Sequence, residues 1–193
     1  MELSLEGINE LYCDRFKSVL GIPTKVTRTH IQNIETILEF VEKHQPTNDE
    51  FVQFVIDDFR IKKNTAIHVR PTLGRANLIL TVNRTNKLTN ISRLYLNEPN
   101  PRYLAKGFLE NYFGFLELIL IINNNNIENK KVMFDKWNKL TIEQIGNRPE
   151  STQRTQFGRI FKYLEIFKLL HKENDTWKVN NTLLEEALSL DVF

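Results

Sequence analysis

ESTQRTQFGRIFKYLEIFKLLHKENDTWKVN, residues 150–180, contains the pattern that decides the fold. Ser151 is a suitable N-cap, and the apolar residues after it recur at helical spacing, which predicts a helix that buries one face. These apolar residues are Phe157, Ile160, Phe161, Leu164 and Phe167. Polar and apolar residues then alternate around a short polar turn, which predicts a two-stranded ribbon over 168–180. A helix followed by such a ribbon is typical of a helix-turn-helix unit with a β-hairpin wing.

The beginning of this predicted helix carries hydroxyl, amide and basic residues, and we expect them on its outward face. They are Thr152, Gln153, Arg154, Gln156 and Arg159, with Lys162 further along. Arginine can form two hydrogen bonds with guanine, and glutamine can do the same with adenine. In a helix-turn-helix protein, residues near the amino end of the second helix reach these base edges in the major groove. The pattern therefore predicts a DNA-reading helix; the alternative is a polar helix start that is only solvated.

The two halves of the chain share one order of elements, although no residue-level repeat is visible between them. Each half is expected to contain a long apolar helix, a short helix, a helix that begins with basic and amide residues, and a two-stranded ribbon. The expected ranges are 29–43, 48–58, 70–77 and 78–97 in the first half, and 103–122, 141–146, 152–168 and 168–180 in the second. We therefore predict a mainly α-helical protein with small β-hairpin wings, built from two winged-helix (helix-turn-helix) units in tandem. The predicted boundaries are 1–28 for a helical amino-terminal lead, 29–100 for the first unit, and 101–193 for the second unit with its long connecting helix.

Cap and turn residues support several of these boundaries. Thr47 and Glu50 have the spacing of a capping box. Pro71 fits the first turn of a short helix, and Asn77 is suited to the left-handed conformation that ends it. In the second half, the Asn-rich segment 123–131 predicts a loop, and Thr141 predicts the start of a separate short helix.

The charge of the chain is distributed unevenly. The net charge is only +2, but residues 60–106 contain ten Lys or Arg and a single acid, Glu98. This window has a charge of +9, which leaves −7 for the rest of the chain. A surface of one sign is typical of a protein that binds a polyanion; the alternative is a solvated basic face without a partner. We expect DNA contacts from this half at Arg70, Thr72, Arg75, Arg84, Lys87 and Arg93. The first wing and its helix are expected to hold phosphates, while residues of both predicted helices touch bases.

The sequence contains no pattern that indicates an active site, and we expect no catalytic residue, metal site or cofactor in this chain. The four histidines are scattered, and no Gly-rich phosphate loop is present. Asp57 and Asp58 are neighbours on a predicted helix and would point in different directions. Glu128 and Lys130 match the E-x-K part of a restriction-nuclease signature, but they fall in the Asn-rich loop. A nuclease with an unrecognised site is the alternative.

Cys13 is the single cysteine, so no intramolecular disulfide can form, and a reducing cytoplasmic setting is expected. The amino terminus carries acids where a signal peptide needs basic residues. The longest apolar stretch, 113–122, is interrupted by Glu117 and is too short to cross a bilayer. We therefore expect a cytoplasmic protein with no membrane partner.

Three strings resemble the DNA-recognition part of type IIS restriction and nicking endonucleases. They are FVIDDFRIKKNTAIHVRPTLGRANLILT at 54–81, YLAKGFLENYFGFLELIL at 103–120 and QRTQFGRIFKYLEIFKLLHKENDTWKVN at 153–180. Such proteins carry winged-helix subdomains ahead of a separate nuclease domain, so the resemblance implies double-stranded DNA as the partner and no cleavage domain within these residues. It implies either the recognition module of a larger enzyme, partnered by a nuclease or methyltransferase domain or subunit, or a stand-alone DNA-binding protein of a defence or regulatory system. The competing hypothesis is a winged-helix scaffold that binds other proteins.

Overall fold

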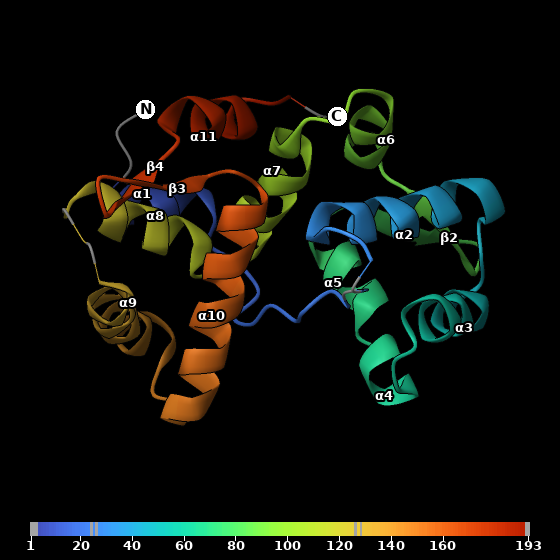
Figure 1. Ribbon diagram of the computed structural model, residues 1–193, viewed down its shortest axis with the longest axis horizontal. Helices are drawn as coiled ribbons and strands as arrows, with labels where there is room; N and C mark the ends of the chain where they lie inside the picture. The colour runs from blue at the N-terminus through green and yellow to red at the C-terminus, as the bar shows by residue number, and fades with distance from the viewer. Residues whose placement is uncertain (1–3, 24, 26, 126, 128, 192–193) are drawn as a thin grey trace. The chain divides into compact units, whose positions relative to one another are not determined.

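The computed structural model describes residues 4–23, 25, 27–125, 127 and 129–191, and it divides into two compact units. The first unit is Leu20–Gly107, and the second unit combines Phe108–Leu190 with the amino-terminal residues up to Val19. Among the described residues, each unit is a set of helices with one small antiparallel β-hairpin (Figure 1). The predicted fold class, mainly α-helical with hairpin wings, is therefore confirmed.

The first unit places its hairpin after a series of helices. Its elements are α2 (His30–His44), α3 (Asn48–Phe59), α4 (Lys63–Ala66), α5 (Val69–Arg75), β1 (Ile79–Val82), β2 (Thr85–Leu88) and α6 (Asn90–Asn97), and α7 (Pro101–Asn111) leads out of the unit. The predicted capping box is confirmed, because Thr47 Oγ1 accepts from the Glu50 backbone and Glu50 accepts from the Thr47 backbone. Apolar residues of α2 and α3 at helical spacing form the core; Ile37, Leu38, Val41, Phe51 and Val55 are all buried.

The second unit has the same arrangement around a more aromatic core. Its elements are α1 (Leu5–Leu11), α8 (Phe115–Asn123), α9 (Lys130–Ile145), α10 (Glu150–Ile166), β3 (Leu170–Glu173), β4 (Thr176–Val179) and α11 (Asn181–Leu188). The five residues predicted for the buried face of α10, Phe157 to Phe167, are buried as expected. The Phe108 ring lies 4.8 Å from the Tyr163 ring and 5.2 Å from the Phe167 ring, measured between centroids. Such rings bury large apolar areas and dominate the stability of a small unit.

A buried ion pair fastens the amino-terminal residues to the second unit. The Arg15 guanidinium donates to the two carboxylate oxygens of Glu117 at 2.5 and 3.1 Å. Only 4% of the Arg15 side chain and none of the Glu117 side chain is exposed. Glu117 also accepts the backbone N–H of Gly114 at 2.7 Å, at the start of α8. The segment up to Val19 is therefore part of the fold of the second unit.

The two hairpins have the same strand register. Ile79 pairs with Leu88 in the first hairpin, and Leu170 pairs with Val179, each 91 residues later, in the second. Both turns consist of two residues with positive φ, as a type I′ hairpin requires. Asn77, with a φ of 54°, has the predicted left-handed conformation, and Lys168 has it at the equivalent place. Once the hairpins are aligned at this spacing, a residue-level correspondence between the two halves becomes visible. Leu73, Leu78, Asn83, Thr85, Lys87 and Asn90 are matched by Leu164, Leu169, Asn174, Thr176, Lys178 and Asn181.

The expected extent of two elements is wrong. The first ribbon ends at Leu88 rather than at Asn97, because Thr89 is the N-cap of the helix α6, which begins at Asn90. The expected long helix over 103–122 is divided into α7 and α8 at Gly114, whose φ of 102° favours glycine. A Cβ atom at Gly114 would also lie only 2.7 Å from Ile160 Cδ1.

Among the described residues, no helix combines the length and apolar character needed to cross a membrane.

The expected helix starts at Thr141 and Ser151 are also wrong. Residues 130–145 form the single helix α9, and the Thr141 hydroxyl donates to the Trp137 carbonyl oxygen at 2.7 Å inside it. A threonine bonded in this way is compatible with a helix interior, so its presence does not require a cap. α10 begins at Glu150 with Pro149 in the N-cap position, so Ser151 lies within the first turn.

Candidate nucleic-acid interface

α5 and the hairpin of the first unit are joined through Arg70 and Asn86. Arg70 Nε donates to Asn86 Oδ1 at 3.1 Å, and Arg70 Nη2 donates to the Thr81 hydroxyl. Asn86 is buried, and its Nδ2 donates to the Pro46 carbonyl oxygen at 3.0 Å. Arg70, a predicted DNA contact, is therefore half-buried and orients the wing against its helix.

Thr72, another predicted DNA contact, faces the interior of the first unit. Its side chain is 1% exposed, and its hydroxyl donates to the His68 carbonyl oxygen at 2.9 Å. It lies three residues after Val69 and directly before Leu73, both of which are buried, so the inner side of α5 includes it. The expectation that Thr72 is presented to a ligand is therefore wrong for this conformation.

The other predicted cations of the first unit reach solvent; Arg75, Arg84 and Arg93 are exposed, and Lys87 is partly exposed. Arg84 occupies the tip of the hairpin, and Lys87 lies opposite Leu80 on its outward face. Arg93 Nε is 3.6 Å from Glu42 Oε1, and both side chains are about half-exposed. Within the described part of the chain, Arg84 and Lys87 have no ion-pair partner. The hairpin side of this unit thus gathers cations that an anion can reach.

The exposed front of α10 in the second unit is made of short hydroxyl residues and one arginine. Ser151, Thr152, Arg154 and Thr155 are exposed, and Lys162 is exposed further along the helix. The Arg154 guanidinium donates to Glu150 Oε1 at 2.8 and 2.5 Å and lies 4.4 Å from the Phe134 ring centroid. Thr155 is not among the predicted DNA contacts. Helical spacing nevertheless places it on the same outer face as Ser151, four residues before it, and Lys162, seven residues after it.

Gln153 and Gln156 are buried, so the expectation that they face outward is wrong. Gln153 is 1% exposed and Gln156 is 7% exposed. Gln156 Oε1 accepts the backbone N–H of Val19 at 2.9 Å, and Arg159 Nη1 donates to the Val19 carbonyl oxygen at 3.2 Å. These side chains therefore hold the amino-terminal segment against α10. The two glutamines are buried because of helical spacing. Gln153 lies four positions before the buried Phe157, and Gln156 lies four positions before the buried Ile160, so each shares a helix face with a core residue.

The two wings present different chemistry at equivalent positions. The outward face of the first hairpin carries Leu80, Val82, Thr85 and Lys87, with Arg84 at the tip. The outward face of the second carries His171, Glu173, Thr176 and Lys178, and Asp175 stands where the first has Arg84. Asp175 also pairs with Lys172 at 3.0 Å. The first wing therefore suits a polyanion better than the second, because two acids lie at or beside the second tip.

The two carboxylates of the acidic pair, Asp57 and Asp58, are each bound to other side chains of the first unit. The Asp57 carboxylate accepts from Gln53 Nε2 at 2.9 and 3.0 Å, whereas Asp58 pairs with Arg28 and Lys25. The two neighbouring carboxylates thus face different partners. Glu128 lies outside the described residues. Among the residues that are described, no three His, Cys, Asp or Glu side chains gather as a metal-binding group.

The fold defines the class of protein. Each unit is a winged helix, in which a helix-turn-helix is followed by a hairpin, and the chain carries two in tandem. In the first unit the Asn86 N–H donates to the Pro46 carbonyl oxygen at 2.7 Å, and in the second the Trp177 N–H donates to the Ile127 carbonyl oxygen at 3.2 Å. The two donors, Asn86 and Trp177, are again 91 residues apart. The hairpin is therefore anchored to the preceding loop in the same way in both units.

The comparisons with known proteins agree with this class at the level of the fold. No protein-family model and no curated protein matches the chain. A solved structure is similar, the "Crystal structure of pyrene- and phenanthrene-modified DNA in complex with the BpuJ1 endonuclease binding domain", with a TM-score of 0.52 and 11% sequence identity. The match covers 90% of this chain and 84% of that chain. The fold of nearly the whole chain therefore resembles the fold of a restriction endonuclease DNA-binding domain.

Proposed function

We propose that this chain binds double-stranded DNA as the recognition part of a restriction or defence system. The observation that carries the proposal is the concentration of accessible cations on the hairpin side of the first unit, within a fold like that of a DNA-binding domain crystallised with DNA. Cations that neutralise phosphates release counterions, which supplies most of the sequence-independent affinity of a DNA-binding protein.

The two units divide the work in this proposal. Arg84, Lys87 and Arg93 of the first unit hold phosphates and position the protein, because they are basic, accessible and near the wing. The front of α10 reads bases, with Arg154 as its cation and Thr152 and Thr155 as hydroxyl donors or acceptors. To contact a base, Arg154 would have to leave its ion pair with Glu150. This loss costs little, because exposed ion pairs contribute only about 0 to 1 kcal/mol.

Electrophoretic mobility shift in low salt, followed by selection of bound sequences from a random duplex pool, tests the proposal. Binding at micromolar protein and enrichment of a common sequence are expected. Absence of a shift on every duplex at that concentration would contradict it.

A scaffold role is the second candidate, and one surface favours it. The rings of Phe40 and Phe54 stack with centroids 3.8 Å apart and an angle of 3° between their planes, and both side chains are only partly buried. His44 lies against Phe40 at 4.8 Å. A partly exposed aromatic pair of this kind can serve as a protein contact. A chain that fails to shift any duplex would favour this role.

A separate nuclease or methyltransferase domain or subunit would supply the chemistry in the proposed system. Purified chain incubated with supercoiled plasmid and Mg²⁺ should leave the plasmid intact. Metal-dependent cleavage that follows the chain through purification would instead establish a nuclease site within it.

A further inference from the structure

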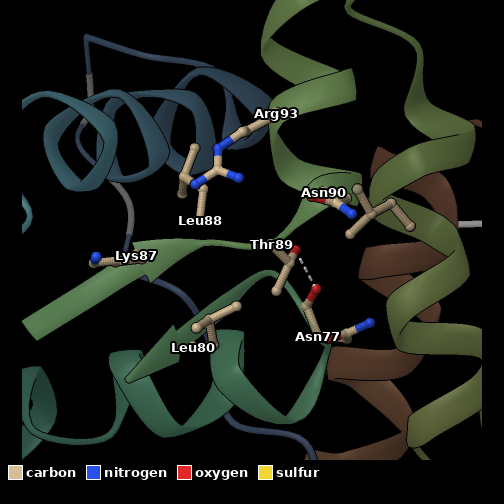
Figure 2. Close-up of a pocket in the computed structure, with 8 residues that line it drawn as sticks. Asn77, Leu80, Lys87, Leu88, Thr89, Asn90 and Arg93 are labelled. Carbon is tan, nitrogen blue, oxygen red and sulfur yellow. Dashed lines mark hydrogen bonds between the residues drawn. The ribbon is translucent and has the colours of Figure 1, made fainter. Parts of the chain in front are cut away.

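A pocket of about 360 Å³ opens on the outward side of the first hairpin, where β2 passes into α6 (Figure 2). Its lining includes the cations Lys87 and Arg93, the side chains of Asn77, Thr89 and Asn90, and the aliphatic surface of Leu80. None of the described lining residues is acidic. This volume is at the lower end of the range of about 300 to 1,000 Å³ for small-ligand pockets, so a single nucleotide is a suitable size of occupant.

The chemistry of the lining matches a phosphate next to a sugar. Lys87 and Arg93 supply charge-assisted donors for phosphate oxygens. Leu80 is 37% exposed and lies directly opposite Lys87 across the hairpin, which places an apolar surface beside a cation. Figure 2 shows Leu80 and Asn77 on one side of Thr89 and Arg93 on the other. An occupant that is only an anion would leave the Leu80 side chain in contact with water.

The second hairpin lacks these features at the equivalent positions. His171 replaces Leu80, and Leu184, which is buried, replaces Arg93. The helix that follows also differs, because Asn180 Oδ1 accepts the Leu183 N–H at 3.2 Å and caps α11. Thr89 instead donates its hydroxyl to the Asn77 carbonyl oxygen at 2.6 Å, and no side chain caps α6. This set of lining residues is thus specific to the first unit, although the hairpin that carries it is common to both units.

We infer that this pocket binds one deoxynucleotide unit of a DNA strand, with its phosphate at Arg93 and Lys87 and its sugar against Leu80. The inference rests on the proposed DNA binding and adds the group that the first wing holds. Glu42 regulates access, because its carboxylate pairs with Arg93 at 3.6 Å and competes with a phosphate for the same guanidinium.

Titration of isotopically labelled full chain with thymidine monophosphate, thymidine or inorganic phosphate, followed by amide NMR spectra, tests the inference. Thymidine monophosphate should shift the amide signals of Leu80, Asn90 and Arg93 and should bind more tightly than thymidine or phosphate. Arg93→Gln should weaken this binding about tenfold, as expected for one charge-assisted hydrogen bond. Glu42→Gln should strengthen it about twofold or more, because a surface ion pair is removed.

Lys178→Gln, at the position that matches Lys87 in the second hairpin, is the control and should bind thymidine monophosphate as the unmodified chain does. The inference is overturned if these signals do not move, if inorganic phosphate binds as tightly, or if Lys178→Gln weakens binding as much as Arg93→Gln. Duplex binding without nucleotide shifts would reject the pocket and leave the proposed function standing. Nucleotide binding at these residues without duplex binding would reject the proposed function and leave the pocket standing.

Discussion

The side-chain oxygen of Gln156 accepts the backbone N–H of Val19 at 2.9 Å, so a residue of the predicted reading helix is bound within the protein. Arg159 binds the carbonyl oxygen of the same residue at 3.2 Å. Both polar groups of Val19 are therefore satisfied by α10 side chains. The front of α10 is divided between an inner side that holds the chain and an outer side that can meet a ligand.

Gln156→Ala should destabilise the second unit by about 1 to 3 kcal/mol, because the buried N–H of Val19 would lose its partner. Urea unfolding of the variant and the unmodified chain measures this difference. Lys139→Ala, an exposed change on α9, is the control and should alter the free energy of unfolding by less than about 0.5 kcal/mol. Equal stability of Gln156→Ala and the unmodified chain would contradict the buried role.

Glu117→Gln should destabilise the protein by about 3 to 5 kcal/mol, since it leaves the Arg15 charge buried without its carboxylate. The matched change Glu150→Gln removes the carboxylate of an exposed pair with Arg154 and should cost at most about 1 kcal/mol. Thermal or urea unfolding compares the two variants. Similar losses in both would show that burial does not control the Arg15 pair.

Asp58 should make the stability of the first unit depend on acid pH. Hydrogen bonds from Arg28 hold the pKa of Asp58 below its ordinary value of 3.8, and Lys25 acts in the same direction. Because the pKa is lower in the folded state, this stabilisation is present above 3.8 and is lost as the pH falls through the folded pKa. Asp58→Asn should therefore lose stability at neutral pH and show a smaller further decrease as the pH falls from about 4 to about 2 in urea unfolding. An unchanged acid dependence in the variant would count against the ion pair.

Arg154→Ala should weaken binding to a selected duplex more than binding to unrelated duplexes, by about 1 to 3 kcal/mol in the difference. The reason is that Arg154 is the accessible arginine at the front of α10, whereas Arg159 is engaged with Val19. Fluorescence anisotropy with both duplexes measures the effect. Equal weakening on every sequence would make Arg154 a phosphate contact instead of a base contact.

The sequence predicts the fold class because its signals are local. Helical spacing in α10, the capping box at Thr47 and the left-handed Asn77 each depend on nearby residues, and each is found in the structure. The break at Gly114 depends on contacts with distant residues, since Trp137 Nε1 donates to its carbonyl oxygen at 3.1 Å and Ile160 leaves no room for a Cβ. Nothing in the residues around Gly114 alone indicates that close approach.

The candidate site is harder to predict from the sequence than the fold class, because residue type alone does not show which side of a helix a residue occupies. Glutamine is typical of base contacts, yet the same periodicity that predicts Phe157 and Ile160 as core also places Gln153 and Gln156 inside. The partner of Gln156 could not be inferred, since Val19 lies far away in the sequence. The role of Thr72 follows the same logic, because it shares a face with Val69.

The salt dependence of duplex binding tests the central claim most directly. The logarithm of the binding constant should fall linearly with the logarithm of salt concentration, by about 0.9 for each phosphate that a cation neutralises. The double variant Arg84→Ala and Lys87→Ala should bind more weakly and show a slope shallower by about 1 to 2, while Lys172→Ala at the second wing should leave the slope unchanged. A slope that is the same in the unmodified chain and the double variant would contradict the claim that the first wing holds the DNA backbone.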